Sequence, residues 1–205
     1  MSHFHPEIRQ RAEELVALYP RARSAMLPLL HLAQEQDGYL SQAGIDDVAA
    51  LTGTTSADVR GTAAFYDMFH LEPVGKYVVG VCTNIACLLA GGEEFLEHAA
   101  KKLGCAVGST TSDGLFTLEE TECLADCDRA PCVQVNHRYV RTTTPATFDA
   151  LVDDLRQGKL DADVPAHGTL IRVRRSGGLR APRQEIADQR VRSSAARAQR
   201  AEEAK

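Results

Sequence analysis

Hydrophobic residues in the first third of the chain recur at the spacing of helices. Pro6 suits the first position of a helix, and apolar residues follow it every three or four positions. Gly38 is a typical left-handed end for a second helix, and Ser41 is a suitable N-cap for a third. Thr55, followed three residues later by Asp58, resembles a capping box that opens a fourth. The pattern predicts a bundle of short helices over residues 6–19, 24–37, 42–52 and 56–65.

The period of the hydrophobic pattern changes after Lys76. Tyr77–Val81 is a continuous apolar run of strand length that leads directly into Cys82. Residues 115–122 alternate between apolar and polar side chains, as a half-buried strand does, and lead into Cys123. The further elements predicted are a strand over 105–109, a hairpin of strands over 133–135 and 138–140, and helices over 93–103 and 145–157.

This order of elements predicts an α+β fold in three parts. Residues 1–73 are expected to form an N-terminal helical domain, and residues 74–160 a small α/β domain. Residues 161–205 are expected to form an extended, disordered basic tail. Both cysteine-rich loops then lie at the ends of strands, where rigid elements can hold them in place.

Composition and charge are typical of a soluble globular protein and argue against a membrane-spanning or nucleic-acid-binding protein. With 44% hydrophobic and 25% charged residues, the 205-residue chain has the composition of a soluble globular protein. No apolar run approaches the roughly 18 residues of a membrane span, and the N-terminus does not resemble a signal peptide, so a cytoplasmic location without membrane insertion is expected. Residues 171–205 carry ten Arg and Lys against four Asp and Glu, a net +6; with −5 for the whole chain, residues 1–170 carry −11. An acidic body argues against nucleic-acid binding.

Five of the six cysteines fall in two short stretches far apart in sequence. Four residues separate Cys82 from Cys87, three separate Cys123 from Cys127, and Cys132 follows closely. Thiolates are soft ligands that suit iron-sulfur clusters, zinc and Cu(I), so we expect the two loops to converge on one such centre. A disulfide framework belongs to short secreted chains. Unequal, wide loops fit a binuclear cluster better than a zinc knuckle, and a zinc-stabilised interaction domain stays as an alternative.

The spacing alone leaves two sets of four ligands. They are Cys82, Cys87, Cys123 and Cys127, or Cys82, Cys87, Cys127 and Cys132. We favour the set with Cys123, because Pro131 imposes an extended approach to Cys132 and a strand begins immediately after it. Cys132 is then expected to point into the sheet as a small buried hydrophobe, and Cys105 to lie in the core. Gly91 and Gly92 allow the backbone to approach the centre closely.

These motifs resemble a known family. Cys123-Leu124-Ala125-Asp126-Cys127, followed shortly by Ala130-Pro131, resembles the second ligand pair of the thioredoxin-like 2Fe-2S subunit of respiratory NADH:quinone oxidoreductase, complex I. The segments Leu27–Leu30, Asp37–Leu40 and Phe65–Phe69 are also similar to it. The resemblance runs from about residue 8 to residue 157 and covers most of the chain.

The resemblance implies a fold, a cofactor and partners. It specifies the α/β domain as thioredoxin-like and assigns one 2Fe-2S cluster to Cys82, Cys87, Cys123 and Cys127. It also implies that the chain is a subunit of the oxidoreductase in its peripheral arm, on the cytoplasmic side of the membrane. There it would exchange one electron with FMN on the partner subunit that binds FMN and NADH.

The chain itself is expected to lack an independent substrate site. It has no glycine-rich dinucleotide fingerprint and no phosphate-binding loop, so FMN and NADH are expected only on the partner. An alternative context is the small diaphorase subunit of an NAD-linked hydrogenase or formate dehydrogenase, which the same module resembles.

Overall fold

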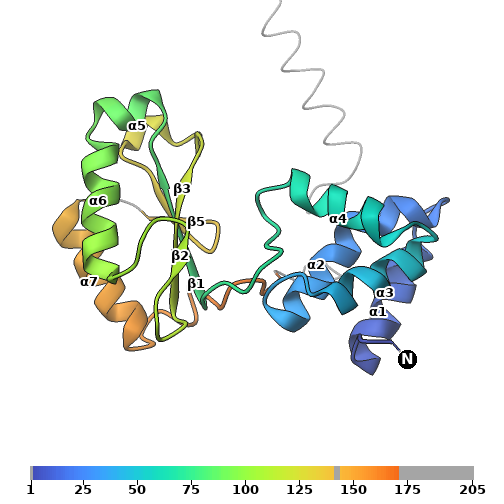
Figure 1. Cartoon of the computed structure of the whole chain (residues 1–205). Coiled ribbons are helices and arrows are strands. Elements are labelled where there is room, and N and C mark those ends of the chain that lie inside the picture. Colours follow the sequence, from blue (N-terminus) through green and yellow to red (C-terminus); the bar gives the residue numbers. More distant parts are fainter. Residues whose placement is uncertain (1, 141–143, 171–205) are drawn as a thin grey trace, which may run out of the picture. The chain divides into compact units, whose positions relative to one another are not determined.

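The helices and strands follow the predicted order, with a few differences in their bounds. The computed structural model of the chain describes residues 2–140 and 144–170. The helices are α1 (Pro6–Val16), α2 (Met26–Asp37), α3 (Gln42–Thr52), α4 (Ser56–Phe65), α5 (Ile85–Leu89), α6 (Gly92–Leu103) and α7 (Pro145–Arg156), with 3-10 turns η1 (Ala22–Ala25) and η2 (Cys127–Arg129) (Figure 1). The strands are β1 (Tyr77–Cys82), β2 (Ser109–Thr110), β3 (Phe116–Thr121), β4 (Val133–Val135) and β5 (Arg138–Val140).

The predicted capping residues Gly38, Ser41 and Thr55 lie at helix ends, whereas α1 ends at Val16, three residues earlier than expected. Ser41 accepts a hydrogen bond from the Gly44 N–H at the start of α3, and Thr55 and Asp58 form both bonds of a capping box at the start of α4. Helix α2 begins two residues later than expected, after the turn η1. Pro28 is therefore the third residue of α2, in the first turn, where backbone N–H groups have no partner within the helix.

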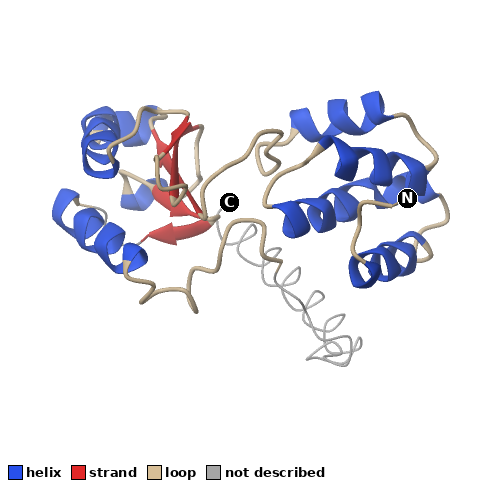
Figure 2. Cartoon of the chain, turned by 60° about the horizontal axis from the view of Figure 1, so that its bottom comes forward, coloured by secondary structure: helices blue, strands red, loops and turns tan. Residues whose placement is uncertain are grey.

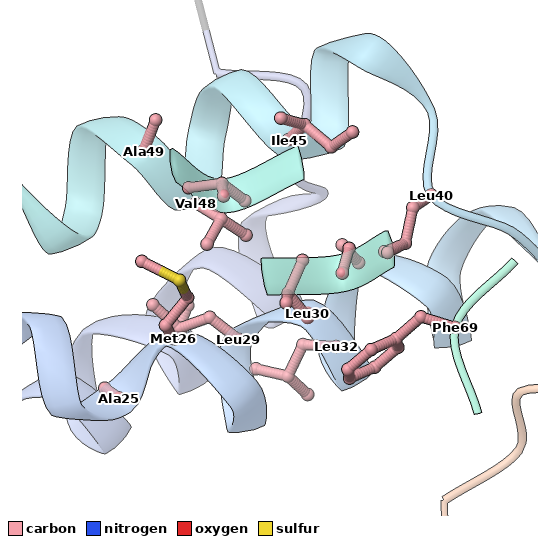
Figure 3. Close-up of a cluster of buried hydrophobic side chains, with 14 of the residues drawn as sticks. Ala25, Met26, Leu29, Leu30, Leu32, Leu40, Ile45, Val48, Ala49 and Phe69 are labelled. Carbon is pink, nitrogen blue, oxygen red and sulfur yellow. The ribbon is translucent and has the colours of Figure 1, made fainter. Parts of the chain in front are cut away.

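Helices α1 to α4 enclose one hydrophobic core. Figure 3 shows Met26, Leu29 and Leu30 of α2 gathered with side chains of α3 such as Val48. Leu29, Leu30 and Val48 are fully buried. Burying a leucine or valine stabilises a fold by about 1.5–3 kcal/mol, so this apolar face holds the short helices together.

The five strands form one mixed sheet in the order β2-β3-β1-β4-β5. The central strand β1 is buried along its whole length, which explains its continuous apolar sequence. It pairs in parallel with β3 and antiparallel with β4, and β4 and β5 form the predicted hairpin around Asn136 and His137. Figures 1 and 2 show α6 and α7 together on one face of the sheet. A second hydrophobic core, which includes Phe95, Phe116 and Phe148, lies there.

Two elements differ from the sequence prediction. The predicted strand over residues 105–109 is wrong, because β2 contains only Ser109 and Thr110. Gly108 has φ +77°, and the Ser109 N–H donates to the Ala106 carbonyl, so the chain turns where a strand was expected. Helix α5 was not predicted.

No helix among residues 2–140 and 144–170 is long and apolar enough to cross a membrane.

Residues 161–170 of the predicted tail pack against the rest of the chain. The Asp161 carboxylate accepts hydrogen bonds from Lys76 and Tyr77, and the His167 N–H donates to the Lys76 carbonyl. The His167 ring is buried beside His70, with 4.6 Å between ring centroids. The remainder of the predicted tail, residues 171–205, lies outside the described residues.

The buried His167 ring predicts a dependence of stability on pH. Burial, together with the nearby His70 and His137, lowers the pKa of His167 to about 4. Between about pH 6.5 and 4, His167 is therefore protonated in the unfolded chain but neutral in the folded chain. Its contribution lowers the free energy of unfolding as the pH is lowered, by about 1.4 kcal/mol per pH unit at most. We expect His167→Phe, which keeps a flat ring beside His70, to reduce this slope between pH 7 and 5.5. Urea unfolding followed by circular dichroism measures it, and an equal slope in both proteins would contradict the assignment.

Candidate metal centre

The pairing of the strands brings both cysteine loops to one edge of the sheet. Strands β1 and β3 are parallel and pair Cys82 with Thr121, so Cys123 follows only two residues beyond that pair. Strand β4 is antiparallel to β1 and begins at the same edge, where the Cys82 N–H donates to the Cys132 carbonyl at 3.0 Å. Segments some 40 residues apart in sequence thus meet. The predicted convergence of the two loops is confirmed by this register.

The first pair, Cys82 and Cys87, is buried. Cys82 ends β1 and Cys87 lies on α5; each is 1% exposed, and both pack in one small buried cluster with Cys132. The Asn84 side chain caps α5 by accepting from the Ile85 N–H at 2.9 Å. The cap lets the chain turn into a helix directly after β1, so that Cys87 folds back towards Cys82.

Gly92, the first residue of α6, packs directly against the loop of the first pair. A Cβ atom there would lie 2.8 Å from the Cys87 carbonyl oxygen and 2.9 Å from that of Cys82. Both neighbours are backbone atoms, which cannot move aside as a flexible side chain can. Gly92 therefore allows α6 to pack against the loop backbone, and the expected approach of this backbone to a bound centre stays a prediction.

The second pair, Cys123 and Cys127, is exposed. Their sulfur atoms are 3.7 Å apart, in the turn that follows β3 and enters η2. Ala125 within this turn has φ +61°, a left-handed conformation that is uncommon for a residue with a Cβ atom. Arg129, the basic residue of this turn, lies 3.7 Å from the Asp126 carboxylate.

Hydrogen bonds join the loops of the two pairs on their outer side. The Thr83 hydroxyl donates to the Glu120 carboxylate at 2.6 Å, and the Asn84 amide donates to the Glu122 carboxylate at 3.1 Å. Thr83 and Asn84 lie between Cys82 and Cys87, whereas Glu120 and Glu122 precede Cys123. Sequence reasoning missed these links, and the alternating polar positions before Cys123 were the only signal for them.

The two remaining cysteines occupy different environments. Cys132 is 3% exposed, so the prediction of burial is confirmed. Its surroundings were not predicted: it packs with Cys82 and Cys87 rather than in the core beneath the sheet, and its N–H donates to the Cys87 sulfur at 3.4 Å. Cys105 is partly buried against the core of the sheet. All six cysteines are described, and all are free.

The surroundings of Cys87, Cys127 and Cys132 raise the pKa of their thiols and so favour the protonated form. Burial raises the pKa of Cys87, and a hydrogen bond with Cys123 raises that of Cys127. Burial and the neighbouring Cys87 raise the pKa of Cys132 to about 12. Metal ligands must be thiolates, so binding at this centre releases protons and weakens as pH falls.

The arrangement suits a cluster with two irons. A four-cysteine 2Fe-2S cluster is held by two thiolates on each iron, and the chain supplies two pairs of neighbouring thiols at one edge of the sheet. The Cys132 N–H directed at the Cys87 sulfur is the type of donor that stabilises negative charge on ligand sulfur. Among residues 2–140 and 144–170, no three Cys, His, Asp or Glu side chains are grouped as they would be around a single metal ion.

The chain is similar to components of known oxidoreductases. It is 46% identical over 145 residues to a component of the NADH-quinone oxidoreductase of Mycobacterium tuberculosis, covering 71% of this chain but only 58% of that protein. It is 41% identical over 150 residues to NADH-quinone oxidoreductase subunit 2 of Thermus thermophilus, covering 72% of this chain and 83% of the relative.

Solved structures and a family description agree on the fold. A chain of the air-oxidized NAD+-reducing [NiFe]-hydrogenase shares the fold, with a TM-score of 0.60 over 73% of this chain and 26% of that one, at 20% identity. The family described as "Thioredoxin-like [2Fe-2S] ferredoxin" matches residues 12–156. The predicted thioredoxin-like fold and 2Fe-2S cofactor are thereby confirmed, and the chain belongs to the thioredoxin-like 2Fe-2S ferredoxin family.

Proposed function

We propose that Cys82, Cys87, Cys123 and Cys127 hold one 2Fe-2S cluster and that the chain is a one-electron carrier. The observation that carries this proposal is the convergence of two cysteine pairs, one buried and one exposed, at one edge of the sheet. Such a cluster supplies reversible one-electron chemistry. The protein fixes the pairs through the strand register, the Asn84 cap and the close approach of Gly92.

The context we propose is NADH:quinone oxidoreductase. Relatives that are 39–46% identical carry that name, and this supports a role as its electron-transfer subunit. The chain spans 58% of the length of the mycobacterial relatives. We place it in the peripheral arm, on the cytoplasmic side of the membrane, together with other subunits of that arm.

The partner we propose is the subunit that binds FMN and NADH. Hydride transfer reduces a flavin by two electrons, which must leave singly when the acceptor is an iron-sulfur cluster. A neighbouring one-electron carrier meets that need. The sequence has no dinucleotide fingerprint, so we assign hydride chemistry to the partner.

Metal analysis of anaerobically purified protein tests the cofactor. We expect about two irons and two acid-labile sulfides per chain and, after reduction with dithionite, a single spin-half EPR signal. Stoichiometric zinc without sulfide, in protein from a host that assembles iron-sulfur clusters, would contradict the electron-transfer role and leave a structural zinc domain. Co-purification with an FMN-containing subunit tests the partner separately.

A further inference from the structure

Three hydrogen bonds connect Cys132 to both cysteine pairs. Its N–H donates to the Cys87 sulfur at 3.4 Å, and its carbonyl accepts from the Cys82 N–H at 3.0 Å. These two bonds use the backbone, so almost any residue at this position could form them. The third bond runs from the Cys132 thiol to the Asp126 carbonyl oxygen at 3.0 Å, and it needs a donor on the side chain.

The acceptor lies in the turn of the second pair. Asp126 directly precedes Cys127, and its carbonyl oxygen also accepts from the Arg129 N–H at 3.0 Å, closing the turn η2. A carbonyl oxygen carries no hydrogen, so its contact with the Cys132 sulfur uses the thiol proton. Cys132 is 3% exposed, so the donor side of this part-buried bond is shielded from water.

The other contacts of this turn are only partly buried or are exposed. Leu124 packs, partly buried, against the cluster of Cys82, Cys87 and Cys132, and its carbonyl oxygen accepts a hydrogen bond from the exposed Tyr139 hydroxyl. Cys123 and Cys127 are both exposed, and the ion pair between Arg129 and Asp126 is of the surface kind that contributes little. Ala125 has a left-handed backbone conformation within the turn. This conformation is strained for a residue with a Cβ atom, so the turn needs other contacts to hold it. The bond from Cys132 therefore joins this strained, exposed turn to the buried side of the centre.

We propose that the Cys132 thiol is a positioning group that holds the turn of Cys123 and Cys127 against the buried pair of Cys82 and Cys87. The inference rests on the proposed function, in which those four cysteines are the ligands. Cys132 is not a ligand in this arrangement. It keeps the exposed pair in place and slows the opening through which the cluster would lose iron.

The test compares Cys132→Val with Cys132→Ser in the full chain carrying its cluster. Valine fills the buried space without a donor, whereas serine restores a donor. We expect both variants to retain about two irons and two sulfides. Iron transfer to a strong chelator should be about fivefold faster in Cys132→Val, equivalent to about 1 kcal/mol, and within about twofold of the parent in Cys132→Ser. The EPR line shape should change in the valine variant and return in the serine variant.

Cys105→Ser is the matched control, since it changes a cysteine of the same domain outside the centre. Its rate of iron loss should equal that of the parent. If Cys132→Val does not fold, Cys132→Ala replaces it, because alanine removes the donor without adding a β-branch. The same faster loss of iron is then expected of the alanine variant.

Other outcomes distinguish a failure of the positioning role of Cys132 from a failure of the proposed ligand set. Full cluster content with parental rates and spectra in Cys132→Val, or equal acceleration in the valine and serine variants, would overturn the positioning role alone. Loss of the cluster in every Cys132 variant, with retention in Cys123→Ala, would make Cys132 a ligand and overturn the proposed ligand set as well.

Discussion

Alanine in place of Cys82, Cys87, Cys123 or Cys127 is expected to abolish the 2Fe-2S cluster. Each substitution leaves one iron with a single thiolate from its pair, which is half of the protein ligands that such an iron requires. Iron and sulfide content should fall from about two per chain to near zero. The EPR signal of the reduced protein should disappear.

Two cysteines outside the proposed set provide the controls. Cys105→Ala and Cys132→Ala should retain the cluster, because neither thiol is a proposed ligand. Circular dichroism of each variant establishes that the fold is kept. Retention of the cluster in Cys123→Ala with its loss in Cys132→Ala would assign the ligands to the rival set that contains Cys132.

The second large effect is expected for Gly92→Ala. The added methyl group would lie 2.8 Å from the Cys87 carbonyl oxygen and 2.9 Å from that of Cys82, so the backbone of the first pair must move. Overpacking of this kind costs about 1–3 kcal/mol of stability. Because the displaced atoms belong to two proposed ligands, we expect cluster content to fall by at least half as well. Urea unfolding and iron analysis measure the two effects.

Gly61→Ala is the matched control for this substitution. Gly61 lies in α4, and a Cβ atom there meets nothing within 4 Å. Alanine in a helix is favoured over glycine by about 0.5–1 kcal/mol, so this variant should be as stable as the parent or slightly more stable, with full cluster content. Equal behaviour of the Gly92 and Gly61 variants would show that the close approach at Gly92 is unimportant.

Local signals in the sequence were sufficient to predict most of the elements. Capping residues such as Ser41 and Thr55 determine helix ends by bonding to backbone groups a few positions away, so a short stretch of sequence contains the information. The hairpin at Asn136 and His137 is equally local. Helix α5 could not be predicted in this way, because its five residues are too few for a periodic pattern.

The cysteine pairs could be recognised from their spacing, whereas the surroundings of Cys132 could not. The position of Cys132 beside Cys87 depends on which strands are neighbours and on the register of β1 with β4. That information is distributed over residues some 50 positions apart. The sequence next to Cys132 equally suits a residue that points into the core beneath the sheet. The bonds that Glu120 and Glu122 accept from the first loop depend in the same way on the long-range register of β1 with β3.

The parallel pairing of β1 with β3 has a consequence for the order of events during biogenesis. The pair of Cys82 with Thr121 closes a long stretch of chain, and such non-local contacts form late because the loop entropy is lost before the contacts compensate for it. Until the sheet exists, the two cysteine pairs are separate and can each capture metal independently. All four proposed ligands therefore come together only once the sheet has formed, and a slow-folding variant would leave the separate pairs open to mismetallation for longer even if its final structure were unchanged.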